Sequence, residues 1–479
     1  MIADLATAEI SIGAPEPHPE SRPPRWTSAA GRSAAPSPLR LQDRWTDASL
    51  RAAGEVRLDG LVSPEVGPIR GELSTLDGTS LPTTTTKIAW NHGKETQFCY
   101  GKSFRPAEAS FVARCEALER IHVIYPPPEE PLVYGSYNEL RDCAVDPRSL
   151  FFPEVRANPI AEPMYWAWAT DPLDGASVLV PAQEIWFNTS NLPGEHDFFR
   201  STTNACALGG TVEDAALFAL FEAVERDSYL TMWYLRRPCA RIDPDTVDHE
   251  PFQLLRRRWG AAFADYDLHL FDITTDVAIP AVAGIAVRRS GDGLRTFHSA
   301  AARLSVERAC FAALKDLTGF TPHLSSERRK EFRRLLHYPE RVSTPEDHYG
   351  LYALDETFER LSFLDFRGDA PRIHAREIGE RALVPAQDRY NLGAVLERVA
   401  EHLRSLGAAA YLKDITHPSL AARGLSCVKV ITPGLYPLWF GANQQRFAVT
   451  DRLRRLARDF GSHELRDERD CNLEVHPFS

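Results

Sequence analysis

The chain has 479 residues, of which 43% are hydrophobic and 25% are charged, as in ordinary globular proteins. With 55 Lys and Arg against 66 Asp and Glu, the formal net charge is -11, which argues against a general nucleic-acid or anionic-membrane surface. The eight Cys form no Cys-x-x-Cys pair, so neither a zinc site nor a disulfide framework is indicated. Since no signal-peptide pattern and no membrane-spanning apolar stretch is present, we expect a cytoplasmic protein.

The N-terminal segment has a different composition from the rest. Residues 1 to about 42 are rich in Pro, Ala, Ser and Arg, with too few large apolar side chains to offset the entropy of ordering them. We predict a disordered Pro/Ala/Arg-rich arm over residues 1–50 and a single domain over residues 51–479. Short apolar runs broken by Gly and Pro predict brief strands and turns over residues 58–86.

Three helices are predicted along the chain. The first begins near Pro106, a favoured first helical residue, and ends before the three prolines that start at Pro126. The second covers about 211–235, where Thr211 resembles an N-cap and Gly209-Gly210 allows a tight turn that brings backbone N–H groups close to a ligand. The third covers 304 to about 317.

Strands alternate with these helices. Aromatic and β-branched residues predict strands within 150–190, two more over 269–288, and a last one over 426–431, which runs into Thr432-Pro433-Gly434-Leu435. Residues 325–406 contain amphipathic helices. The alternation predicts an α/β class with mixed sheets packed against helices.

One charged pattern occurs twice. Glu116 and Glu119 are followed by Arg120, and Glu222 and Glu225 are followed by Arg226. In each unit the first glutamate stands seven residues after an Ala. Positions i and i+3 lie on one face of a helix, so each helix points two carboxylates in one direction.

Two such helices facing one another would make a four-carboxylate box. Oxygen ligands of this kind suit Mg2+ and the nucleotide phosphates that accompany it, and the two arginines could contact phosphate or brace the carboxylates. A single Glu-x-x-Glu-Arg is usually plain surface charge; the apolar context and the recurrence favour a site. Asp214 lies too far along the helix from Glu225 to share a metal with it, and either lines the site or favours the helix N-terminus.

These motifs together resemble the YcaO family. The run from Asn204 through Glu213-Asp214-Ala215 to Glu222-x-x-Glu225-Arg226-Asp227 is similar to that family's second helix, and Gly101-Lys102-Ser103 with the Glu116 unit to its first. Residues 430–435 resemble its late strand, and residues 472–479 resemble the His-Pro tail of cyclodehydratases that make thiazoles and oxazoles.

The resemblance implies a YcaO-type fold around a central ATP site and an enzyme that converts Cys, Ser or Thr of a ribosomal precursor peptide into azolines, by phosphorylating the preceding amide oxygen. Glu116, Glu119, Glu222 and Glu225 would hold Mg2+. The ATP-binding residues would be Lys102, Glu116, Glu119, Arg120, Asn204, Asp214, Glu222, Glu225, Arg226, Asp316 and Lys429. The carboxylate of Ser479 would accept a proton.

Some positions depart from the family pattern. Val112 stands where a Ser is usual, and the third helix has Asp316 for a Glu and Gly319 for a Gln, with Arg303 where a His is common. A degenerate scaffold subunit therefore stays open, as does a YcaO enzyme that forms thioamides or amidines. The implied partners are the precursor peptide, a separate leader-peptide-binding protein and a flavin-dependent azoline dehydrogenase, with no nucleic acid and no membrane. A homodimer also stays open.

Overall fold

A computed structural model describes residues 58, 60–64, 67–75, 81–90, 95–153, 158–321, 323–368 and 371–478. The arm predicted over residues 1–50 lies outside these ranges, as does Ser479. The described part is a mixed α/β structure with several sheets, which confirms the predicted fold class. None of its helices is long and apolar enough to cross a membrane.

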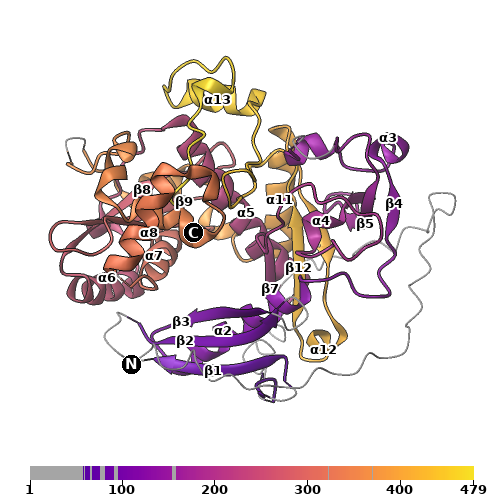
Figure 1. The fold of residues 1–479 in the computed structure, drawn as a ribbon, viewed down its shortest axis with the longest axis horizontal. Helices are drawn as coiled ribbons and strands as arrows, with labels where there is room; N and C mark the ends of the chain where they lie inside the picture. The colour runs from indigo at the N-terminus through magenta and orange to yellow at the C-terminus, as the bar shows by residue number, and fades with distance from the viewer. Residues whose placement is uncertain are drawn as a thin grey trace.

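Three sheets organise the described residues (Figure 1). The first is antiparallel, in the order β1 (Ile69–Thr75), β2 (Thr83–Trp90), β3 (Glu95–Lys102). The second has the order β10 (Thr296–Ala302), β9 (Ala281–Arg288), β8 (Tyr266–Asp272). The third has the order β4 (Val133–Gly135), β5 (Met164–Thr170), β11 (Tyr411–Asp414), β12 (Ser426–Ile431), β7 (Cys206–Gly209), with β6 (Ser177–Pro181) on β5.

The central helix is α5 (Val212–Leu235), which contacts strands of two sheets, β7 and β12 on one side and β9 and β10 on the other. Its N-cap Thr211 accepts a hydrogen bond from the Asp214 N–H, as the sequence predicted. Most of its residues are buried, because a helix that is apolar on nearly every side lies in the core.

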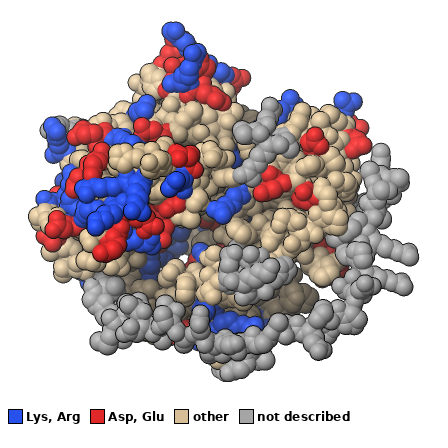
Figure 2. Space-filling model, in the orientation of Figure 1, with Lys and Arg blue, Asp and Glu red and all other residues tan. Residues whose placement is uncertain are grey.

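Further helices surround this frame. They are α2 (Pro106–His122), α3 (Tyr137–Leu140), α4 (Ala182–Ile185), α6 (Glu250–Ala262), α7 (Val306–Leu317), α8 (Ser326–His337), α9 (Pro345–Tyr352), α10 (Ala375–Glu380), α11 (Leu392–Ser405), α12 (Pro418–Ala421) and α13 (Asp451–Asp459). On the face drawn in Figure 2, basic and acidic side chains lie next to one another over α8, where Arg328 pairs with Glu331 and Glu346.

The three predicted helices are confirmed as α2, α5 and α7, each within two residues of its expected start. The strands predicted over 269–288 and 426–431 are confirmed as β8, β9 and β12. Five strands were missed: β3, within a segment that the sequence suggested only leads into the first helix, the short strands β4, β7 and β11, and β10, whose residues are mainly small.

Glycine sets the distance between strand and helix in both halves of the repeat. A Cβ on Gly101 of β3 would lie 1.9 Å from the Ala109 carbonyl oxygen of α2, and a Cβ on Gly209 of β7 would lie 2.4 Å from the Ala215 nitrogen of α5. Only a residue without a side chain permits such contact. Both helices that carry the glutamate pairs are thus seated directly on a preceding strand.

Candidate active site

The two glutamate pairs share one electrostatic environment. Burial raises the pKa of Glu119 of α2, which is half-buried, and the charges of Glu222 on α5 and of Glu116 raise it further. The charge of Asp316, at the end of α7, acts on both Glu116 and Glu225. The structure therefore brings together carboxylates from three helices that the sequence placed up to about 200 residues apart, as the sequence predicted for two of those helices.

On α2, the carboxylate of Glu116 is held by two partners. Arg120 forms an ion pair with Glu116 at 2.7 Å, and the Tyr100 backbone N–H of β3 donates a hydrogen bond to it at 2.6 Å. Arg120 also donates to the Phe98 carbonyl oxygen at 3.2 Å. The Arg120 guanidinium braces the carboxylate, which was one of its two predicted roles.

On α5, Arg226 bridges the second pair, with 2.9 Å to an oxygen of Glu222 and 2.9 Å to an oxygen of Glu225. The second Glu222 oxygen accepts a hydrogen bond from the Ala205 N–H at 2.9 Å. Ala205 has a φ of 56°, a left-handed conformation that is costly for a residue other than glycine. The contact thus ties a strained backbone position to the carboxylate.

Burial shifts the ionisation of this cluster. It raises the pKa of Glu225 to about 7, although the adjacent Arg226 and the more distant Arg303 oppose the shift. The same effect raises the pKa of Glu116, where Arg120 opposes it. A cation that approaches these carboxyl groups would favour their ionised form and so oppose the effect of burial.

The residue types fit a magnesium-nucleotide complex. Within the described ranges, however, no three His, Cys, Asp or Glu side chains are arranged as a metal-binding group. Arg120 and Arg226 instead provide the positive charge between the carboxylates. The carboxylate oxygens are ligands of the kind Mg2+ takes, and they would bind it once these guanidinium groups turn toward phosphate.

The third helix contributes differently from the other two. Lys102 of β3 donates to the Asp316 backbone carbonyl at 3.2 Å, and burial lowers the pKa of Lys102. Asp316 itself is exposed. A Cβ on Gly319 would lie 2.2 Å from the Lys102 Nζ atom, so the glycine at this unusual position makes room for the lysine. Val112, the other departure, is 39% exposed.

Three further residues that the sequence assigned to the nucleotide site are Asp214, Lys429 and Asn204. Asp214 accepts a hydrogen bond from the Gly210 N–H at 3.0 Å, and this N–H group therefore already has a partner within the chain. Burial raises the pKa of Asp214. Lys429 of β12 is buried and donates to the carbonyl oxygens of Asn204 and Thr202. The side-chain nitrogen of Asn204 is buried without a hydrogen-bond partner in the described structure.

Asp227, the last residue of the charged motif, has a structural partner. Arg452 of α13 donates to both of its oxygens, at 2.8 and 2.7 Å, and also pairs with Asp276 at 2.6 Å. Asp227 also accepts from the Tyr436 N–H at 3.0 Å. This buried carboxylate anchors the segment after β12 rather than facing the glutamate pairs.

The C-terminal segment runs back from α13 toward the centre of the molecule (Figure 1). Asn472 donates its N–H to the Tyr234 carbonyl at 2.8 Å, and Trp233 donates to the Glu474 carbonyl at 2.8 Å. The Phe478 ring then lies 4.6 Å from the Tyr229 ring and next to Arg226. The tail thus follows α5 to the glutamate pair, in agreement with the predicted tail position.

Sequence reasoning missed several residues. His348 of α9 holds the tail by hydrogen bonding at 3.1 Å to the His476 carbonyl oxygen. Arg446 and Glu184 form a buried ion pair next to Lys429. No local pattern marks His348 and Arg446, because their contacts join residues 128 and 262 positions apart.

Comparisons with known proteins agree on one family. A family model described as YcaO cyclodehydratase, ATP- and Mg2+-binding, matches residues 100–436. A protein of Rhizobium leguminosarum bv. trifolii, described as uncharacterized and in the tfuA 3' region, is 32% identical over 130 residues, which are 26% of this chain and 30% of that protein.

Solved structures share the fold. A heterocyclase in complex with substrate and cofactor has a TM-score of 0.73 at 21% identity, covering 92% of this chain and 59% of that one. The heterocyclase TruD has a TM-score of 0.61 at 20% identity, covering 91% and 55%. YcaO from Methanopyrus kandleri, bound with AMPPCP and Mg2+, has a TM-score of 0.55 at 18% identity, covering 77% and 86%. The chain therefore spans less than two thirds of the two heterocyclases.

Proposed function

The chain is a member of the YcaO family, which is described as ATP- and Mg2+-binding, and on that premise we propose that it is an ATP-dependent peptide cyclodehydratase. Its substrate would be a ribosomal precursor peptide in which Cys, Ser or Thr becomes an azoline. The observation that carries the proposal is the convergence of the two half-buried Glu-Arg units of α2 and α5, in which Glu225 is buried and burial raises its pKa to about 7.

The reaction has a simple difficulty, because an amide oxygen is a poor leaving group. In the proposed reaction a side-chain thiol or hydroxyl adds to the preceding amide carbon, and the amide oxygen takes the γ-phosphoryl group of ATP. Phosphate then leaves with that oxygen, so each ring costs one ATP and removes one water. The protein would act mainly by positioning and by electrostatic stabilisation.

The roles of the chain's residues follow from their placement. Glu116, Glu119, Glu222 and Glu225 would hold Mg2+, which supplies charge neutralisation to the phosphates. Arg120 and Arg226 would turn from these carboxylates to phosphate oxygens. Nucleotide contacts would also come from Lys102, Asn204, Asp214, Asp316 and Lys429. The terminal carboxylate of Ser479 would accept the proton released from the peptide.

Partners are part of the proposal. A separate leader-peptide-binding protein would deliver the precursor, and a flavin-dependent dehydrogenase would oxidise the azolines. Support comes from a structural neighbour of low identity, the E. coli microcin synthetase McbBCD complex with pro-MccB17 bound, which has a TM-score of 0.58 and covers 88% of this chain.

A scaffold without catalysis is the second candidate. It is favoured by the exposure of Asp316 and by the two arginines that pair with the carboxylates. Incubation of the protein with its partner, a candidate precursor and Mg-ATP distinguishes the two. Loss of one water per ring by mass spectrometry, with phosphate release, supports the cyclodehydratase. Sulfur replacing oxygen indicates thioamide formation, and peptide binding without either change indicates a scaffold.

A further inference from the structure

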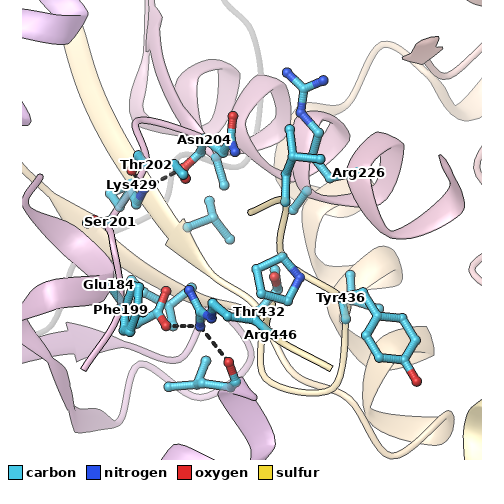
Figure 3. A pocket seen from close by; sticks show the side chains of 18 residues that line it. Glu184, Phe199, Ser201, Thr202, Asn204, Arg226, Lys429, Thr432, Tyr436 and Arg446 are labelled. Atoms are coloured by element: carbon cyan, nitrogen blue, oxygen red, sulfur yellow. Dashed lines mark hydrogen bonds and ion pairs between the residues drawn. The ribbon is translucent and has the colours of Figure 1, made fainter. Parts of the chain in front are cut away.

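A small pocket lies next to the glutamate cluster, between β12, α4 and the segment that follows β12 (Figure 3). Its volume is about 50 Å3, which leaves room for a few water molecules but not for a nucleotide. Its polar lining includes Asn204, Lys429, Arg446 and Glu184.

Lys429 is the unusual member of this lining. It is 4% exposed, and its Nζ atom donates only to the backbone carbonyls of Thr202 and Asn204. Throughout the described part of the chain it forms no ion pair. A buried ammonium group without a negatively charged partner is costly, and carbonyl oxygens compensate only part of its charge. An anion in the pocket would remove this cost.

Further donors around the pocket are also unused. The Asn204 side-chain nitrogen and the Arg446 Nε atom are buried and have no hydrogen-bond partner in the described structure. Arg446 is 5% exposed, and its positive charge is matched by Glu184. The pocket therefore combines a lysine that forms no ion pair in the described structure with at least two free N–H groups. This donor set is complementary to an oxyanion.

The pocket is joined to the glutamate cluster through two adjacent residues. The Ala205 N–H donates to Glu222 at 2.9 Å, whereas the neighbouring Asn204 lines the pocket. Burial lowers the pKa of Lys429, and the charges of Cys206, of Glu184 at the pocket and of Glu222 in the cluster oppose this shift. A group that passes from the cluster to the pocket would therefore stay in contact with one continuous surface.

We infer that this pocket binds a phosphate-sized oxyanion and, resting on the proposed function, that this anion is the phosphate which leaves the peptide. In that step the bond between the amide carbon and its oxygen breaks, and phosphate takes the electron pair. The amide nitrogen gives up its proton to a base and forms the carbon–nitrogen double bond of the azoline. Arg446 would bind the departing phosphate together with Lys429, which would thus contact the phosphoryl group both before and after its transfer, while the glutamates would hold Mg2+ and ADP.

Inorganic phosphate itself is the probe that tests this inference. The full-length protein, saturated with ADP and Mg2+, is titrated with phosphate in a calorimeter. We expect binding to one site, weakened roughly tenfold or more in Lys429→Met and in Arg446→Gln, because each removes a charged donor. Lys330→Met, on the exposed face of α8, serves as the matched control and should bind phosphate normally.

Several results would overturn the assignment. One is unchanged phosphate affinity in both variants, and another is no binding to the folded wild-type protein. A third is phosphate binding that is seen without ADP but is lost in the ADP-saturated protein, which would make the anion site part of the nucleotide site. If Arg446→Gln does not fold, Arg446→Lys is measured in its place. Because this variant keeps the positive charge, it should weaken phosphate binding less than Lys429→Met does. Because the titration needs no turnover, phosphate binding by a protein that fails to cyclise peptides would reject only the proposed reaction.

Discussion

The guanidinium carbon of Arg226 lies 4.5 Å from the centre of the Phe478 ring. One of these residues bridges the α5 glutamate pair, and the other belongs to the C-terminal segment, so the tail and the charged cluster are in direct contact. A cation next to an aromatic face is attracted by its quadrupole. The contact limits how Arg226 can move when it turns toward another anion.

Phe478→Ala should loosen the tail. Phe478 is 3% exposed and also packs on Tyr229, so truncation removes both contacts. We expect hydrogen exchange of the amides over residues 472–478 to accelerate by about tenfold or more, with loss of turnover. Phe218→Ala, at an exposed position of α5, the helix that carries Tyr229, should change neither the exchange nor the turnover. Equal exchange in the two variants would show that the Phe478 ring does not hold the tail.

Glu222→Gln and Glu225→Gln should each abolish turnover while leaving the fold intact. Glutamine keeps the size and an acceptor oxygen but removes the charge that Mg2+ requires. Loss of one such electrostatic contact costs about 100-fold or more in rate. Phosphate release and thermal melting measure the two effects, with Glu397→Gln on the exposed face of α11 as control. Normal turnover in both variants would refute the magnesium site.

The stability of the protein should depend on pH through Glu225. Its pKa rises from 4.5 to about 7 on folding, mainly because of burial. Between these values the folded protein keeps a proton that the unfolded chain has released, so the free energy of unfolding falls as pH rises from 4.5 to 7 and levels off above. Urea denaturation at several pH values should show a shallower fall in Glu225→Gln. Identical profiles would contradict the assignment.

Mg2+ and the proton should compete for the same carboxylates, so the stabilisation of the fold by Mg2+ should increase as the pH rises. Since the metal binds the ionised carboxylates, the rise in melting temperature on adding Mg2+ and a nucleotide analogue should be larger at pH 8 than at pH 6. An equal rise at both values would show that Glu225 does not take part.

Arg452→Met should destabilise the fold strongly. It leaves Asp227, which is fully buried, without its charged partner, and breaking a buried pair in this way costs about 3–5 kcal/mol. Chemical denaturation measures the change. Arg454→Met, two positions along the same helix and 38% exposed, should stay within about 0.5 kcal/mol of the wild type; a similarly small change in Arg452→Met would contradict the role of the pair.

Two glycine-to-alanine substitutions should change the free energy of unfolding in opposite directions. In Gly101→Ala the new Cβ would lie 1.9 Å from the Ala109 oxygen, so strand or helix must shift, at a cost of about 1–3 kcal/mol. In Gly260→Ala on α6 the Cβ meets no atom within 4 Å, and alanine favours the helix by about 0.5–1 kcal/mol. Denaturation curves check both signs.

Local signals account for what the sequence predicted well. A proline at Pro106 and a threonine cap at Thr211 mark where α2 and α5 begin, and the repeated glutamate spacing places two carboxylates on one face of each helix. Strand β10 carries no comparable signal: its small residues lie in a strand because β9 pairs with all seven of them.

In the site, too, contacts between residues far apart in the chain leave no local signal in the sequence. The convergence of α2 and α5 could be predicted because both carry one motif, but the position of Arg452 beside Asp227 depends on residues 225 positions apart. Nothing in the sequence therefore indicates that the partner of Asp227 is Arg452. Likewise, Lys102 and Gly319 are neighbours only because β3 packs near the end of α7.

Strand β3 lies at the edge of its sheet among the described strands, and α2 occupies part of that edge. Glu116 accepts from the Tyr100 N–H, and Arg120 donates to the Phe98 carbonyl. Open edges of this kind invite pairing with other chains. The two charged side chains thus also guard against aggregation, so an inactive Glu116 variant must first be shown to be monodisperse before its inactivity is attributed to lost chemistry.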